Sequence, residues 1–183
     1  MNQIHIITDA GSDIVNPDRA DLTILPMTIR FGDEEFQDGV NLTHRQFYEK
    51  LIENDTLPTT SQPSPFLFEN AIRSVLEKGD IPLIITISSK LSGTWQSACI
   101  AAGEFEETVY IVDSESVAVG EKALVEYAAP LKGSGRQHPH DCGYSRTGRK
   151  NQLCVLGLLD TLEYLQRAGG SPNRCDRGKP AFH

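Results

Sequence analysis

The chain has 183 residues, of which 39% are hydrophobic, and a formal net charge of −8 at pH 7. This is enough apolar material for one domain with a real core. No apolar run approaches the length of a membrane span, and the N-terminus lacks the basic and apolar pattern of a signal peptide. The four cysteines show neither metal-ligand spacing nor a disulfide framework. We therefore expect a cytoplasmic protein with reduced cysteines and no stable membrane insertion.

The charge is unevenly distributed along the chain. Residues 1–130 carry a net charge of −13, whereas residues 131–183 carry +5. The acidic first part argues against nucleic acid as a partner. The basic segment at 132–150 has almost no aliphatic residue and no periodicity, so it predicts no ordered binding patch. His138, His140 and Cys142 lie in that segment without a fourth ligand, and we predict no metal site there.

Apolar periodicity divides the chain into alternating strands and helices. An α/β fold follows from this order, with a parallel sheet covered by helices on both faces. The expected strands are residues 3–8, 22–31, 83–87, 109–112 and 153–156, with a hairpin turn at 31–36. The expected helices are residues 65–78, 92–105, 114–129 and 159–166, and one more that begins at Thr43.

The helix at Thr43 has a capping box, because Gln46 follows three residues later. Its apolar face is predicted to belong to the core rather than to a ligand pocket. That face consists of Phe47, Tyr48, Leu51 and Ile52.

The segment at 84–98 reads as a buried strand, a polar loop and a helix. The loop brings Ser92, Gly93 and Thr94 to the start of the helix. The first turn of a helix has free N–H groups and a partial positive charge, and glycine lets a ligand approach the backbone closely. This arrangement predicts an anion site for a phosphate or a carboxylate. The alternative is that Ser92 only caps its own helix.

A second polar segment precedes the helix at 65–78. Ser64 suits the N-cap and Pro65 suits the first helical position. A capped helix entry explains these two residues. It leaves the polar run at 59–62 without a role.

Several motifs together resemble the DegV family of bacterial lipid-binding proteins. They occur in family order and at family-like spacing, up to about residue 130 and again at about 153–170. Ala10 departs from the pattern, because the family usually has serine there. The matching segments are Ile-Thr-Asp-Ala-Gly-Ser-Asp at 7–13, Thr-Ile-Leu-Pro-Met at 23–27, Phe-Gln-Asp-Gly at 36–39, Thr-Thr-Ser-Gln-Pro-Ser at 59–64, Ser-Ser-Lys-Leu-Ser-Gly-Thr at 88–94, Val-Asp-Ser at 112–114 and Leu-Asp-Thr-Leu-Glu-Tyr-Leu at 159–165.

The resemblance implies a carrier rather than an enzyme. DegV-like proteins hold one long-chain fatty acid in a tunnel between two domains. Some serve as the binding subunit of a bacterial fatty acid kinase and present the carboxylate to a separate catalytic subunit. The fatty acid is then the ligand, and no cofactor or metal is implied.

The resemblance also assigns residues to the carboxylate site. Thr60 and Ser92 would hold the carboxylate, and the backbone at Gly93 and Thr94 would donate N–H groups. Secondary candidates are Ser61, Gln62, Asp9 and Ser12. The chemistry is consistent, because a buried carboxylate needs hydrogen bonds. Hydroxyl and N–H groups supply them without a lysine, whose tight ion pair would reduce the reactivity of the carboxylate.

The resemblance gives a domain division. Residues 1–130 form a DegV-type α/β fatty-acid-binding domain, 131–152 an irregular segment, 153–170 a remnant strand and helix, and 171–183 an irregular tail. The second α/β domain is mostly missing. We take as a hypothesis that the chain is truncated and frame-shifted after about residue 130.

Two other interpretations stay open at this point. The first is a phosphate-handling enzyme that uses the helix N-terminus at Ser92, Gly93 and Thr94, although neither common glycine-rich nucleotide motif is present. A serine hydrolase is weaker still, because Ser92 lacks the Gly-x-Ser-x-Gly elbow. The second is a fragment with no working site.

Overall fold

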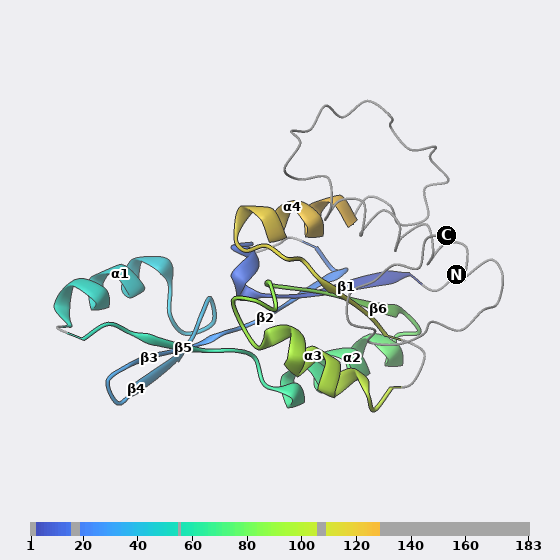
Figure 1. Cartoon of the computed structure of the whole chain (residues 1–183), viewed down its shortest axis with the longest axis horizontal. Helices are drawn as coiled ribbons and strands as arrows, with labels where there is room; N and C mark the ends of the chain where they lie inside the picture. The colour runs from blue at the N-terminus through green and yellow to red at the C-terminus, as the bar shows by residue number, and fades with distance from the viewer. Residues whose placement is uncertain (1–2, 16–18, 55, 106–108, 129–183) are drawn as a thin grey trace, which may run out of the picture.

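A computed structural model describes residues 3–15, 19–54, 56–105 and 109–128 (Figure 1). The strand and helix expected at 153–166, and the segments into which the chain after 130 was divided, lie outside these residues. Cys142, Cys154 and Cys175 lie outside them as well. Within the described part of the chain, no helix is both long and apolar enough to cross a membrane.

Four parallel strands form the main sheet, in the order β2-β1-β6-β7. Their residues are mostly isoleucine, leucine and valine, which suit a strand that is buried on both faces. The fold is therefore α/β, as the sequence predicted. The bounds are Ile4–Asp9 for β1, Leu22–Leu25 for β2, Ile81–Thr86 for β6 and Tyr110–Asp113 for β7.

Helices cover both faces of this sheet (Figure 1). Successive side chains of a strand point to opposite faces, so Ile6 packs with α4 (Val119–Ala128) while Ile7 packs with α2 (Pro65–Glu77) and α3 (Thr94–Ala102). The two faces make separate apolar clusters, and together these are the core of the main sheet.

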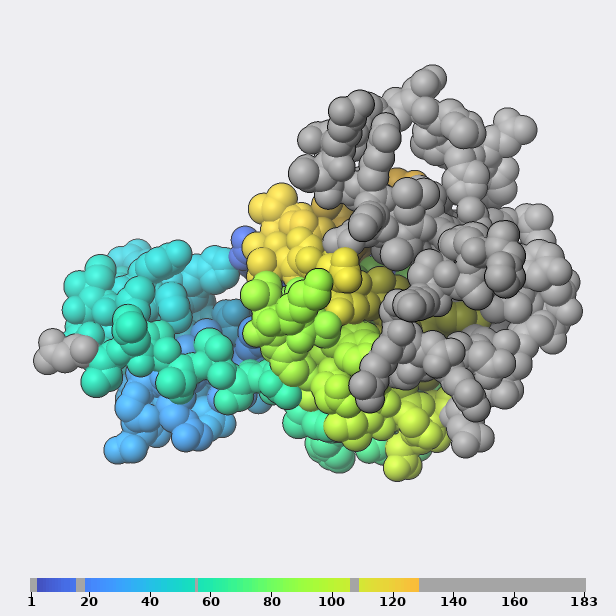
Figure 2. Space-filling model, in the orientation of Figure 1, coloured from blue at the N-terminus to red at the C-terminus, as the bar shows by residue number. Residues whose placement is uncertain are grey.

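A smaller antiparallel sheet extends to one side of the main sheet, as Figures 1 and 2 show. Its strand order is β4-β3-β5, and α1 (His44–Glu53) lies over it. The predicted hairpin is confirmed, with Gly32 at φ +57° between β3 and β4. The bounds are Thr28–Phe31 for β3, Glu34–Gln37 for β4 and Thr59–Ser61 for β5.

The prediction of one strand over 22–31 was wrong. Pro26 lies between β2 and β3 and has no N–H to donate to a sheet, so the chain leaves the parallel sheet there and enters the antiparallel one. Strand β5 was not predicted, because its short polar run shows no alternation of apolar residues.

Two helices begin at the residues that the sequence predicted, because a side chain caps the first turn of each. The capping box of Thr43 and Gln46 is present, and the Ser64 hydroxyl accepts the N–H of Leu67 at 3.4 Å. The last described helix begins at Val119 rather than at 114. A turn that contains Glu115 and Ala118, both at positive φ, occupies the residues before it.

The apolar face of α1 was predicted correctly only in part. Phe47 and Leu51 are half-buried against the core of the small sheet, which consists of Ile29, Phe31 and Leu42. Tyr48 and Ile52 point to solvent, with 62% and 84% of their surfaces exposed. They do not belong to the core, because the small sheet covers only one side of the helix.

Candidate functional site at the carboxyl edge of the main sheet

The main sheet has a topological switch point between β1 and β6. From β1 the chain goes to β2 on one side, and from β6 it goes to β7 on the other. The connections after the two adjacent strands therefore diverge, and open α/β sheets generally bind ligands outside the carboxyl ends of strands at such a point. In this chain the loops that follow Asp9 and Thr86 lie at this edge.

Asp9 joins the ends of the two strands at this edge. Its side chain is fully buried, with Oδ1 accepting the N–H of Gly11 and Oδ2 accepting the N–H of Ile87, both at 2.9 Å. Ser12 is also buried and donates its hydroxyl to the carbonyl of Asp9 at 2.8 Å. Both residues were secondary candidates for ligand contact. In the structure their polar atoms hold the turn of the short 3₁₀ helix η1 (Ala10–Ser12).

Backbone hydrogen bonds join this turn and the β6–α3 loop to a third loop, which follows β7. The N–H of Ala118 donates to the carbonyl of Gly11 at 2.7 Å, and the N–H of Ser88 donates to the carbonyl of Ser116 at 2.8 Å. The three loops are thus joined to one another by hydrogen bonds at the carboxyl edge of the main sheet.

Helix α3 begins at this edge. Gly93 is its N-cap residue and makes no side-chain cap. The Ser92 hydroxyl lies 2.9 Å from the Thr94 hydroxyl and accepts the N–H of Thr94 at 3.3 Å. Ser92 therefore does not act as the N-cap, although it satisfies one backbone donor. Helix geometry leaves the next N–H groups of the first turn without an intrahelical acceptor.

The predicted Thr60 segment and the predicted Ser92 segment meet through Gln62. The Gln62 amide donates from Nε2 to Ser97 Oγ at 3.4 Å, and it lies against the backbone of Gly93. Thr60 and Ser61 lie on β5, with exposed side chains. The assignment of Thr60, Ser92, Gly93 and Thr94 to a carboxylate stays a prediction.

Sequence reasoning missed Glu121, a fully buried carboxyl group on α4. Its Oε1 accepts the Thr8 hydroxyl at 2.9 Å, and its Oε2 has no hydrogen-bond partner among the described residues. Burial and the nearby charge of Asp9 raise the pKa of Glu121 to about 9. Burial also raises the pKa of Asp9, against the two backbone hydrogen bonds that favour its charged form. We assign the proton to Glu121, because Asp9 has the two N–H donors.

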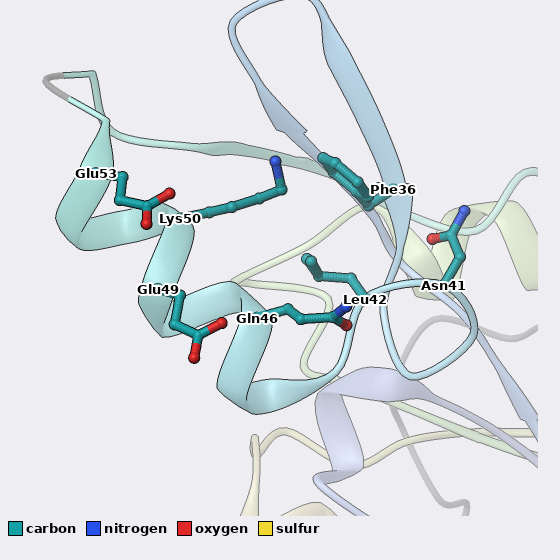
Figure 3. A pocket seen from close by; sticks show the side chains of 7 residues that line it. All are labelled: Phe36, Asn41, Leu42, Gln46, Glu49, Lys50 and Glu53. Atoms are coloured by element: carbon teal, nitrogen blue, oxygen red, sulfur yellow. The ribbon is translucent and has the colours of Figure 1, made fainter.

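A second hollow lies away from this edge, between α1 and β4 (Figure 3). It has a volume of about 220 Å³ and is lined by Phe36, Asn41, Leu42, Gln46, Glu49, Lys50 and Glu53. The Lys50 ammonium forms an ion pair with Glu34 at 2.6 Å and lies 4.7 Å from the centre of the Phe36 ring. Two glutamates and an already paired lysine make this hollow a poor site for an anion.

Metal ligands do not cluster in the part of the chain that the structure describes, where no three histidine, cysteine or acidic side chains converge. His138, His140 and Cys142 lie outside that part.

Comparison with known proteins decides the family. The model of the DegV family, described as "Uncharacterised protein, DegV family", matches residues 3–178. The chain belongs to the DegV family. A DegV domain-containing protein of Clostridium perfringens is 39% identical over 185 residues, which covers 100% of this chain and 64% of that protein. The chain thus spans less than two thirds of this DegV relative.

Solved DegV structures have the same fold. A fatty-acid-binding DegV family protein from Thermus thermophilus is 31% identical, with a TM-score of 0.67 over 91% of this chain and 60% of that one. The fatty acid kinase B3 protein of Streptococcus pneumoniae, solved with linoleic acid, is 23% identical, with a TM-score of 0.62 over 92% of this chain and 54% of that one. The likeness to this last protein shows the fold alone.

Proposed function

We propose that this DegV chain binds a long-chain fatty acid and presents its carboxylate to a separate fatty acid kinase catalytic subunit. The main support is that the two polar segments meet at the switch point, where Gln62 contacts the first turn of α3 beside Ser92. Support also comes from the Thermus thermophilus DegV protein, which binds a fatty acid. The role is that of a cytoplasmic carrier, with no catalytic residue of its own.

The chemistry of the edge suits a carboxylate head group. The Ser92 hydroxyl donates to one carboxylate oxygen, and the N–H groups of the first turn of α3 add the positive end of the helix dipole. Thr60, at the end of the small sheet, supplies the second hydroxyl. These donors are uncharged, so they hold the carboxylate without fixing it in an ion pair.

Apolar side chains next to the same edge suit an acyl chain. Leu91 directly precedes Ser92 and is 65% exposed. Val119, at the start of α4, is 75% exposed, and Val117 in the same loop is exposed as well. Exposed apolar groups beside a polar site favour an amphiphilic ligand over a small hydrophilic one.

Binding of stearate tests the proposal. Trp95 is the only tryptophan and lies in the first turn of α3, so its fluorescence reports on this edge. We expect Ser92→Ala to weaken stearate binding about ten- to a hundredfold, as for one hydrogen bond to a charged group. Ser89→Ala, which removes an exposed hydroxyl from the same loop, is the matched control and should leave the affinity unchanged.

Lipid extraction of the purified protein, followed by mass spectrometry, separates the remaining alternatives. A co-purified fatty acid supports the proposal. Binding of inorganic phosphate without any effect of stearate would favour the phosphate-handling enzyme. A chain that is folded and binds neither would be a fragment without a working site.

A further inference from the structure

Gln62 connects the two sheets of the molecule at the proposed site. It directly follows β5, which belongs to the small sheet, and its amide reaches α3, which covers the main sheet. The acceptor of its hydrogen bond, Ser97, is buried in the first turns of α3. Gln62 itself is exposed to solvent, so the amide contact is made from an otherwise exposed side chain.

Gly93 shows how close this contact is. A Cβ atom at this position would lie 2.5 Å from Nε2, 2.8 Å from Oε1 and 2.9 Å from Cδ of Gln62. The backbone of Gly93 has φ −77° and ψ 7°, which any L-residue can adopt. A side chain at this position would therefore not strain the backbone, but it would displace the end of the Gln62 side chain, which occupies that space.

The contact lies just after one end of β5, and strand pairing with β3 holds β5 along its length. Thr60 pairs with Ile29 of β3, two residues before the Gln62 contact. After Gln62 the chain is held by buried Pro63 and by the Ser64 cap of α2. Gln62 is thus the point at which the strand that carries Thr60 is attached to the helix that follows Ser92.

We propose that Gln62 is a positioning residue, which sets the separation between the Thr60 and Ser92 hydroxyls by anchoring the end of β5 on Ser97 and Gly93 of α3. It acts through these groups and does not itself contact the ligand. The inference rests on the proposed function, because it concerns how the two carboxylate-binding hydroxyls are held.

The anchor is tested first without ligand, by NMR of the Gln62 side-chain NH₂ group in the full chain. In the unsubstituted protein its resonances should differ from those of a glutamine whose amide has no protein partner. Gly93→Ala should displace the amide and Ser97→Ala should remove its acceptor, so each variant should move the resonances toward the values of a free amide. Resonances that already match a free amide in the unsubstituted protein would overturn the anchor.

Stearate titration of Trp95 fluorescence then tests positioning. Gln62→Ala should weaken stearate binding about tenfold, and Ser97→Ala should also weaken it, although Ser97 is only the anchor point. Thr60→Val should weaken binding about tenfold alone, but less than about twofold in the Gln62→Ala background, because Thr60 is then already displaced. Ser89→Ala remains the control.

Three results of the stearate titration would overturn the inference. An unchanged affinity in Gln62→Ala would do so and leave the proposed function intact. Loss of affinity in Gln62→Ala with none in Ser97→Ala would mean that Gln62 binds the ligand directly. Absence of stearate binding by the unsubstituted chain would overturn the proposed function and the positioning role together, even if the NMR experiment confirmed the anchor.

Discussion

The Thr60 and Ser92 hydroxyls act on one carboxylate in the proposed site, although they come from different parts of the fold. Thr60 lies on the small sheet and Ser92 in the loop after β6 of the main sheet. Each hydrogen bond to a charged group contributes about 1.5–3 kcal/mol. The two contributions are coupled, because loss of either bond lets the carboxylate move.

We therefore predict non-additive losses of stearate affinity. Thr60→Val and Ser92→Ala should each weaken binding by about one to two decades, and the double variant should weaken it by clearly less than the product of the two losses. Isothermal titration of all four proteins measures the coupling. Fully multiplicative losses would mean that the two hydroxyls act at separate places.

The buried Glu121 makes the stability of the fold depend on pH. Its pKa is raised from an ordinary value of 4.5 to about 9 in the folded chain. Between these values the folded state binds a proton that the unfolded state releases, so stability falls as the pH rises from about 4.5 to 9. Below this window both states are protonated, and the stabilisation by the bound proton is fully present.

Glu121→Gln should remove this pH dependence of stability. Glutamine keeps the shape of the side chain and the acceptor for the Thr8 hydroxyl, but it has no titratable proton. We expect the variant to be more stable than the parent at pH 8, on the order of 2 kcal/mol, with a smaller difference at pH 5. Urea unfolding at the two pH values measures this. The exposed Glu77→Gln on α2 is the control. A variant that is less stable than the parent at pH 8 would show that the Glu121 charge is stabilising.

At the scale of elements, the sequence predicted best what neighbouring residues decide. The capping box of Thr43 and the Ser64 cap are local, and each is present. Pro26 was also visible in the sequence, but continuous apolar residues on both sides hid the change of sheet. The start of α4 was misplaced, because the turn before it is set by contacts with other loops, such as Ala118 with Gly11.

The motifs of the candidate site could be predicted from the sequence, but their arrangement in space could not. The N-terminus of α3 could be read from a strand followed by a polar loop and a helix. The contact of Gln62 with Ser97 joins residues 35 apart in the chain, and the bond of Thr8 with Glu121 joins residues 113 apart. No periodicity or spacing reports on such pairs. Only the fold brings them together.

In helix α1, two adjacent apolar residues differ in burial, so they should contribute differently to stability. Leu51 is half-buried against the core of the small sheet, whereas Ile52 is exposed. We predict that Leu51→Ala lowers the free energy of unfolding by about 1–2 kcal/mol and that Ile52→Ala changes it by less than about 0.5 kcal/mol. Urea denaturation of both variants measures this. Equal losses would mean that a further surface covers the outer side of α1.

At the scale of the whole molecule, the two sheets have different roles. The main sheet has two apolar clusters and provides the rigid edge with Ser92 and the N-terminus of α3. The small sheet has a smaller core and carries Thr60 on β5, where it pairs with Ile29 of β3. In the proposed site, binding therefore depends on how firmly the small sheet is attached to the main sheet.

A crystal structure of the chain with stearate would locate the bound carboxylate. We predict carboxylate oxygens at about 2.7–3.2 Å from the hydroxyls of Ser92 and Thr60, on the side that faces the N–H groups of the first turn of α3. The acyl chain should contact Leu91 and Val119. A carboxylate bound to Lys50 in the hollow between α1 and β4 (Figure 3), or anywhere away from the carboxyl ends of β1 and β6, would contradict it.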